Sequence, residues 1–450
     1  MLDYLIKDGD YPDYKTNKIV QGNIGIKGKY IVYLGMLEPA AKETIDASGM
    51  IVSPGFIDIH MHEEDFLKEG KHYDISNHML EMGVTTACGG NCGHSRQPLR
   101  IFKHIVRELG GAPINYCMQS GYNNLRVDDG IGPFEKTTEK MREKYIRVLN
   151  EEIKEGSYGV SFGIEYDPGI TFEEMIFISR VSDNPDHLFS AHYRSDTTKN
   201  LDSVKEMIRF SKEIKPRFQI SHLSSCAAFS NMKDALYLID KAMERDPGLN
   251  FDTYPYNAFS CTLVSTVFDE GFLDDWGKGY EDVLLLGEPY KNIRCTEEIF
   301  RKARKDYPGM LAVAFAMEEE DIRLAVKHKS GMIASDGLLR DGNGHPRAAG
   351  TFPRVLGRYV RDAKLMPMID ALRKMTLEPA ERLRLFNKGR IEEGCDADIT
   401  VFDPEAIMDR ADFSYLEKPD GIKHIFIWGE PAMIEGEVIN RRLGKFIPFS

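Results

Sequence analysis

Two histidines, His60 and His62, end the short apolar segment Gly55-Phe-Ile-Asp-Ile-His-Met-His62. Residues two apart in a β-strand point to the same face, so both imidazoles would leave one strand in the same direction. Two ring nitrogens placed in this way can bind one metal ion, because neutral imidazole is a common metal ligand. This segment therefore predicts a metal site, and a metal that activates water would make the protein a hydrolase.

Four more residues of ligand or acid–base type follow short apolar runs at wide intervals: Cys92 in Gly89-Gly-Asn-Cys-Gly93, His192 in Ser190-Ala-His-Tyr-Arg194, His222 in Ile220-Ser-His-Leu223, and Asp336 in Ala334-Ser-Asp-Gly337. Each has a structural explanation when taken alone. A histidine at a strand end is often hydrogen-bonded core, a lone cysteine is often a small hydrophobe, and Ser-Asp-Gly is often a turn. The set matters only if the fold brings its members together.

Eight short β-prone runs alternate with longer segments that carry apolar residues at helical spacing, such as 139–155 and 231–244. Strands that alternate with helices predict parallel βα units, and eight of them predict an α/β fold with a TIM-like (β/α)8 barrel. Active sites of such barrels lie at the carboxyl ends of the strands, where all six residues stand. The location of all six residues at one end of the predicted barrel favours a metal site. The runs are 56–62, 85–91, 114–120, 158–164, 188–194, 218–223, 250–256 and 332–336.

The two ends of the chain have shorter strands separated by turns, which is typical of antiparallel hairpins. Neither end holds enough strands for a core of its own. We therefore expect residues 1–54 and 389–450 to form one small composite β-sandwich domain, with the barrel, residues 55–388, between them. The interval before the last run is too long for one helix, which predicts an insertion around 264–330 that covers the mouth of the barrel.

The composition narrows the class of protein further. A net charge of −13 argues against nucleic acid or an anionic membrane as a partner and leaves a small-molecule substrate. Seven cysteines without regular spacing do not predict a disulfide framework. The first residues lack a signal-peptide pattern, and no apolar run approaches the roughly 20 residues of a membrane helix. A cytoplasmic location is expected, and a homo-oligomer remains open.

Further motifs make the chain resemble the amidohydrolase superfamily, and within it the N-acyl-D-amino-acid deacylase (D-aminoacylase) group. The segment with His60 and His62 alone would indicate only the superfamily. The resemblance covers nearly the whole chain, and Gly90-Asn-Cys-Gly93 together with His-Pro-Arg and Gly-Thr-Phe-Pro in 345–353 is its more specific part. The other matching segments are Gly83-Val-Thr-Thr86, Gly163-Ile-Glu-Tyr-Asp-Pro-Gly169, Tyr254-Pro-Tyr256, Lys374-Met-Thr-Leu-Glu-Pro-Ala380 and Gly394-Cys-Asp-Ala-Asp-Ile-Thr-Val-Phe-Asp403.

This resemblance implies roles for the ligand-type residues. A zinc ion would be held tightly by Cys92, His192 and His222, and a second, weaker site would use His60 and His62 and share Cys92. Asp336 would act as general base and general acid. Many superfamily members bridge two metals with a carboxylated lysine after the fourth strand, but residues 160–166 contain none. Glu165 could supply a bridging carboxylate or contact the substrate.

Four residues in the matched motifs are expected to bind substrate: Tyr166, Arg194, Tyr254 and Arg347. Arg347 could hold a substrate carboxylate through two parallel hydrogen bonds, or it could form an ordinary ion pair. The deacylases commonly carry a lysine two residues after the histidine of the sixth strand, whereas this chain has Ser224. A hydroxyl cannot replace an ammonium charge, so the substrate could be held differently, or it could be a neutral or cyclic amide.

The resemblance implies a zinc-dependent amidohydrolase that cleaves the amide bond of N-acyl-D-amino acids with metal-activated water. A cyclic amidase of the dihydroorotase or hydantoinase kind is the alternative within the same chemistry. A non-catalytic barrel that binds a metal or a ligand is the alternative from another class, and the complete ligand set together with Asp336 argues against it. We expect structural or surface roles for Cys88, His72, His78 and His94.

Overall fold

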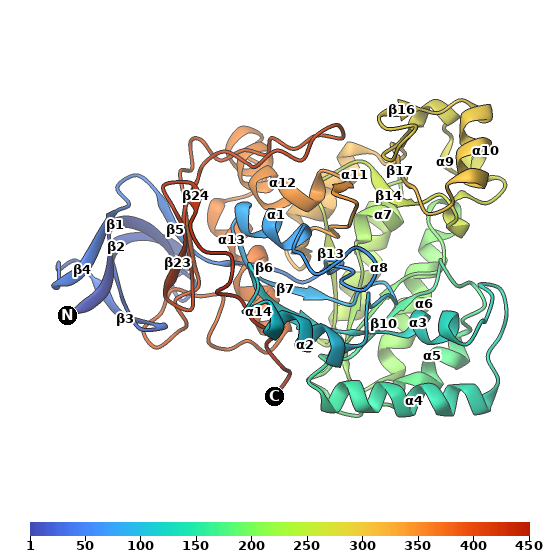
Figure 1. The fold of residues 1–450 in the computed structure, drawn as a ribbon, viewed down its shortest axis with the longest axis horizontal. Helices are drawn as coiled ribbons and strands as arrows, with labels where there is room; N and C mark the ends of the chain where they lie inside the picture. Colours follow the sequence, from blue (N-terminus) through green and yellow to red (C-terminus); the bar gives the residue numbers. More distant parts are fainter.

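The computed structural model describes residues 1–450, apart from the side chain of Thr198. Figure 1 shows a β-rich region at one end of the molecule, which holds the N-terminus, and a larger region of parallel strands and helices beside it. A small subregion with β16, α9 and α10 projects at the opposite end. None of the helices in the described chain combines the length and apolar character needed to cross a membrane.

Both ends of the chain contribute strands to one sheet of the β-rich region. Strand β5 runs antiparallel to β21, with Val52 opposite Val401. Isoleucines and valines from both ends fill the apolar core beneath this sheet. In the part of the chain that the structure describes, the sheet joins β1 (Leu2–Asp13), β2 (Lys18–Lys27), β3 (Tyr30–Gly35), β4 (Ala41–Asp46), β5 (Ile51–Pro54), β21 (Ile399–Phe402), β22 (Ile422–Ile427), β23 (Glu430–Ile434) and β24 (Glu437–Val438).

Short parallel strands occupy each of the eight runs expected to be strands. They form two sheets, in the orders β6-β7-β8 and β18-β13-β12-β11-β10-β9. Each strand reads as a nearly continuous buried segment, as expected for parallel strands covered on both faces. Their bounds are β6 (Phe56–Asp58), β7 (Val84–Gly89), β8 (Asn115–Met118), β9 (Ser120–Gly121), β10 (Val160–Gly163), β11 (Leu188–His192), β12 (Arg217–Ile220), β13 (Leu249–Thr253) and β18 (Met332–Ile333).

Backbone hydrogen bonds connect the two parallel sheets at both edges. On one side Met61 forms a parallel bridge with Gly337, and the Asp336 amide donates to the His60 carbonyl over 2.8 Å. On the other side the Tyr158 amide donates to the Met118 carbonyl over 2.8 Å. The segments after β6 and β18, which carry ligand-type residues, therefore lie side by side.

Helices connect successive strands and bury their apolar faces against them. Threonine side chains cap some of their first turns; for example, Thr138 accepts from the Met141 amide at the start of α4. The bounds are α1 (Ile75–Glu81), α2 (Leu99–Glu108), α3 (Tyr122–Asp128), α4 (Glu139–Lys154), α5 (Phe172–Ser179), η1 (Thr197–Lys199), α6 (Asn200–Glu213), α7 (Leu223–Ala227), α8 (Met232–Met243), α11 (Glu319–Lys327), α12 (Arg347–Arg354), η4 (Val355–Asp362), α13 (Met368–Met375) and α14 (Leu377–Arg382).

An antiparallel sheet of its own interrupts the connection between β13 and β18. It joins β14 (Phe259–Thr262), β17 (Leu311–Ala314), β15 (Val283–Leu285) and β16 (Ile293–Arg294), with η2 (Thr266–Phe268), α9 (Phe272–Trp276), η3 (Tyr280–Asp282) and α10 (Glu297–Asp306) between the strands. This sheet spans 259–314, so it begins and ends earlier than the expected insertion around 264–330. The sheet ends well before residue 330 because residues 319–327 form helix α11, which packs against α8. A two-stranded hairpin, β19 (Leu339–Arg340) and β20 (Asn343–Gly344), follows β18.

A buried polar cluster fastens the composite sheet to the parallel strands. Lys388 Nζ donates to Asp398 Oδ2 over 2.6 Å, and the same carboxylate oxygen accepts from Asn115 Nδ2 over 3.1 Å. The indole of Trp428 donates to Asn115 Oδ1 over 2.7 Å. Asn115 belongs to β8 and the other residues to the C-terminal segment, so this cluster joins parts of the chain that are distant in sequence.

Candidate metal centre

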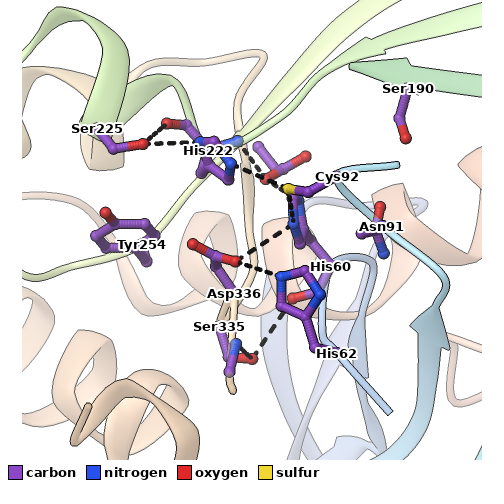
Figure 2. Close-up of polar contacts among 12 residues, drawn as sticks. His60, His62, Asn91, Cys92, Ser190, His222, Ser225, Tyr254, Ser335 and Asp336 are labelled. Carbon is purple, nitrogen blue, oxygen red and sulfur yellow. Dashed lines mark hydrogen bonds and ion pairs between the residues drawn. The ribbon is translucent and has the colours of Figure 1, made fainter. Parts of the chain in front are cut away.

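Cys92, His60 and His222 meet at the carboxyl ends of the parallel strands, and all three are buried. The Cys92 sulfur lies 3.3 Å from His60 Nε2 and 3.2 Å from His222 Nε2. Figure 2 shows the sulfur between the two rings. The segments that carry these residues follow β6, β7 and β12, so the parallel strands deliver three separate motifs to one point.

The second nitrogen of each of these two rings is held by a neighbour. His60 Nδ1 lies 3.1 Å from Asp252 Oδ1 on β13, and His222 Nδ1 lies 2.7 Å from Ser225 Oγ. Asp252 also accepts from the His222 amide over 2.8 Å. These partners fix ring orientation and tautomer, which is the usual arrangement around metal-binding histidines. Asp252 and Ser225 belong to no motif with ligand spacing, and only their polar character within buried segments could have pointed to them.

His192 completes the first group of potential ligands. Its Nε2 lies 2.7 Å from Glu165 Oε2, whereas its Nδ1 is buried without a hydrogen-bond partner in the described structure. Ligand atoms of Cys92, His192 and His222 all lie within 4.8 Å of one another. A thiolate and two imidazoles, one with an unpartnered buried nitrogen, form a donor set that suits a zinc-like cation.

A second group shares the thiol of Cys92 and contains His60, His62 and Asp336, again with ligand atoms within 4.8 Å of one another. Asp336 Oδ1 lies 3.1 Å from His62 Nε2 and 3.4 Å from His60 Nε2. The other oxygen, Oδ2, lies 2.9 Å from Arg347 Nη2 in an ion pair. Figure 2 shows Asp336 facing both rings.

The backbone around the site is unusual as well. Cys92, His222 and Asp336 have φ values of 53°, 31° and 49°, in the left-handed region that residues with a side chain rarely adopt. Such conformations persist where the surrounding structure holds them, and they cluster at functional sites. No sequence signal would have predicted them, because none of the three residues is glycine.

The electrostatics of the site favour a cation. Burial alone would raise the pKa of the Cys92 thiol, but the charges of His60 and His222 hold this pKa well below its usual value. Burial opposes protonation of His192, yet the neighbouring Cys92 and Glu165 raise its pKa to about 10. Thiolate and carboxylate are thus balanced by ring protons, and a metal ion can replace those protons.

Two carboxylates at the site have opposite pKa shifts. Burial would raise the pKa of Asp336, but the charges of Arg347 and His222 hold it below its ordinary value. Burial raises the pKa of Asp196 well above its ordinary value, and the nearby Glu165 carboxylate adds to this rise. Asp336 is therefore the better-stabilised anion of the two.

The residues expected to bind substrate divide into two groups. Tyr166, Tyr254 and Arg347 line a cavity together with His192, His222 and Asp336. The Arg347 guanidinium lies 4.7 Å from the centre of the Tyr254 ring, and its Nε and Nη1 have no partner among the described residues. By contrast, Arg194 is outside this wall and donates to both carboxylate oxygens of Glu206 on α6, over 2.9 and 2.8 Å. The structure therefore gives Arg194 an ion pair rather than a place at the cavity.

Ser224, which stands where the related deacylases commonly have a lysine, is fully buried. Its hydroxyl accepts from the Tyr254 amide over 3.4 Å, and it is not part of the cavity wall. His94 lies beside Tyr166, and burial lowers its pKa to about 3, so it is an uncharged neighbour of the site. Cys88 is a buried residue of β7, and His72 and His78 belong to none of the groups of potential metal ligands in the described structure.

This arrangement defines a class: α/β proteins that gather a buried thiolate, imidazoles and a carboxylate at the carboxyl ends of parallel strands to hold a metal ion. The sequence profile of the amidohydrolase family matches residues 291–437. N-acyl-D-glutamate deacylase of Alcaligenes xylosoxydans xylosoxydans is 30% identical over 95% of this chain and 93% of its own length. D-aminoacylase of the same organism is 29% identical over 99% and 97%.

A solved structure agrees with these sequence matches. N-acyl-D-glutamate deacylase from Bordetella bronchiseptica, in complex with zinc and a phosphonate inhibitor, superimposes with a TM-score of 0.87 and is 25% identical over 99% of both chains. The chain therefore belongs to the amidohydrolase family, in its N-acyl-D-amino-acid deacylase group.

Proposed function

We propose that this protein is a zinc-dependent hydrolase that cleaves the amide bond of N-acyl-D-amino acids. The observation that carries the proposal is the pair of ligand groups that share Cys92, with Asp336 beside them. The relatives named for deacylation of N-acyl-D-amino acids support the substrate class. The proposed fold is a closed (β/α)8 barrel of residues 55–388, supported by the hydrogen bonds at both sheet edges, with a β-sandwich from 1–54 and 389–450.

Cys92 Sγ, His192 Nδ1 and His222 Nε2 would hold the principal zinc ion. Each histidine of this group uses its other nitrogen for a neighbour, Glu165 or Ser225, so one nitrogen per ring is free for a metal. His60 and His62 would form the weaker site. When bound, zinc makes a water molecule nucleophilic near neutral pH and polarises the scissile carbonyl group.

Asp336 would accept the proton of the attacking water and return it to the leaving nitrogen. A group in this role must be ionised and within hydrogen-bond reach of the reacting atoms. Arg347 keeps the carboxylate ionised through its 2.9 Å contact, and His62 orients the opposite oxygen. The proton can therefore be held on one defined oxygen, Oδ1, which faces the ligand groups.

Arg347 would bind the α-carboxylate of the substrate. Its Nε and Nη1 are buried donors without partners among the residues described, and an unpaired buried donor is costly unless a ligand satisfies it. Tyr254 supports the guanidinium from one face. Glu165, in this proposal, positions His192 rather than bridging two metals, because its carboxylate contacts the ring nitrogen that points away from the free Nδ1.

The cyclic amidase remains the second candidate, and Ser224 is the observation that favours it. Without a lysine at this position the cavity offers less positive charge to a carboxylate, which suits a neutral ring. A preference for linear amides would separate the two functions, since a cyclic amidase would open rings and leave linear amides intact.

The proposed function can be tested with the zinc-loaded protein and matched N-acetyl-D- and N-acetyl-L-amino acids, measuring release of free amine. We expect release from the D series only. The Asp336→Asn variant should retain zinc and lose activity by about 100-fold or more, because the acid–base group is missing. Ring opening of a cyclic amide without release from either linear series would instead support the cyclic amidase.

A further inference from the structure

Asp196 is a buried carboxylate at the cavity wall that the proposed chemistry does not use. It follows β11 in the chain, is 6% exposed and lines the same cavity as Arg347 and Asp336. Its Oδ1 atom is buried and has no hydrogen-bond partner among the described residues. Ligand-type atoms of Glu165, His192 and Asp196 lie within 4.8 Å of one another.

The other two carboxylates of this wall already have partners. Asp336 is paired with Arg347 at 2.9 Å, and Glu165 with His192 at 2.7 Å. Asp196 is thus the one carboxylate of the described wall without an ion pair. A buried carboxylate without a partner is unfavourable, and a ligand that supplies a counter-charge would compensate it.

Position 224 adds to this imbalance of charge. A lysine there would bring a positive charge close to Tyr254. The hydroxyl of Ser224 is uncharged and accepts a hydrogen bond from the backbone amide of Tyr254. The described wall combines one cation with free donors, Arg347, and one carboxyl group without a partner, Asp196, which ionises readily only when a counter-charge lies beside it. A complementary ligand carries a carboxylate for the first and a hydrogen-bond-donating cation for the second.

We propose that Asp196 determines specificity by binding a cationic side chain of the substrate, so that the enzyme prefers N-acyl derivatives of basic D-amino acids. This inference rests on the proposed function and specifies its substrate class. It differs from the acidic class for which the relative N-acyl-D-glutamate deacylase is named. The carboxylate accepts hydrogen bonds from the ammonium or guanidinium group, which stays charged throughout the reaction.

The test compares N-acetyl-D-lysine with N-acetyl-D-norleucine, which has an uncharged side chain of similar length, and with N-acetyl-D-glutamate. For the zinc-loaded wild type we expect kcat/KM to be about tenfold or more higher for the lysine derivative than for either other substrate, as a buried charged hydrogen bond predicts. In Asp196→Asn the lysine-to-norleucine ratio should fall to about one.

Asp202→Asn is the matched control, because Asp202 lies on the nearby helix α6 but is 80% exposed and pairs with the exposed Lys205. This variant should keep the wild-type ratio. Circular dichroism and zinc content establish that Asp196→Asn is folded, and Asp196→Ser repeats the measurement if it is not. The inference would be overturned if the lysine-to-norleucine ratio were the same in the wild type and in folded Asp196 variants. A wild-type preference for the glutamate derivative would also overturn it.

Binding of the free amino acids separates this inference from the proposed function. Calorimetry with the zinc-loaded protein should show D-lysine binding about tenfold more tightly than D-norleucine, with the difference lost in Asp196→Asn. Equal binding of the two amino acids contradicts the role of Asp196, whether or not the protein hydrolyses amides. Absence of amide hydrolysis combined with selective D-lysine binding contradicts the proposed function alone.

Discussion

Cys92 is the residue that both ligand groups share, so its replacement is the most direct test of the metal centre. In Cys92→Ser the soft thiolate is replaced by a hydroxyl that does not ionise near neutral pH. We expect zinc affinity to fall by about 100-fold or more, measured by metal analysis after dialysis against a weak chelator. The control Cys395→Ser changes a buried cysteine of the C-terminal segment and should retain zinc. Equal zinc content in both variants would exclude Cys92 as a ligand.

The affinity for zinc should also depend on pH in a defined direction. In the metal-free protein, the neighbouring Cys92 and Glu165 raise the pKa of His192 to about 10, despite its burial. Zinc must displace this proton, so affinity rises with pH up to that pKa and falls as the pH is lowered. A single displaced proton changes affinity about tenfold per pH unit.

A competition titration with a chelator of known affinity, from about pH 6 to about pH 9, measures this dependence. Glu165→Gln removes a hydrogen bond that raises the pKa of His192. The zinc affinity of Glu165→Gln should therefore reach a plateau at a lower pH than the zinc affinity of the wild type. A pH-independent affinity in the wild type would contradict the assignment of His192 as a ligand.

The residues of the site were predictable from sequence to different degrees. His60 and His62 were the easiest to predict, because two residues that are two positions apart in a strand share a face whatever the rest of the fold does. Asp252, Ser225 and Asp196 were not recognised, since each is an isolated polar residue whose importance depends on contacts across the fold. Arg194 pairs with Glu206 on α6 and is not part of the described cavity wall, so the substrate contact expected for it stays a prediction.

At the scale of elements, Lys388 holds the composite sheet to the parallel strands. It is buried and lies 2.6 Å from Asp398 and 3.2 Å from Asp396. Lys388→Met should lower the free energy of unfolding by about 3–5 kcal/mol, because two buried carboxylates lose their counter-charge. Urea unfolding measures the loss. Lys15→Met, which breaks an exposed ion pair with Glu392, should leave stability nearly unchanged.

The eight predicted β runs all contain parallel strands, because alternation of apolar strands with amphipathic helices is a local pattern. The strands are shorter than the runs. The first ends at Asp58 and the last at Ile333, before the ligand-type residues begin. After these points the backbone turns to direct side chains into the site, as the left-handed φ of Asp336 illustrates. Helical and strand spacing carries no information about such departures.

At the scale of the whole molecule, the metal centre joins segments from β6, β7, β11, β12 and β18, so metal binding should stabilise the entire fold. A ligand that binds only the folded state stabilises it by about 2.7 kcal/mol when its free concentration is about 100 times its dissociation constant. Chelation of zinc should therefore lower the melting temperature of the wild type. Cys92→Ser should show little response to the chelator, and a response equal to that of the wild type would place the stabilising metal elsewhere.

The sequence by itself predicted the family, an α/β fold and the identity of the ligand-type residues. The comparisons confirm the family. They were accessible because strand spacing, motif order and residue chemistry are local properties of the chain. Tertiary structure alone decided which histidine nitrogens are free, which carboxylates are paired, and that Asp196 Oδ1 has no partner among the described residues. These properties depend on contacts between residues that are far apart in the sequence, such as Cys92 and His222, which are 130 positions apart. They also depend on which charged groups the fold buries next to one another.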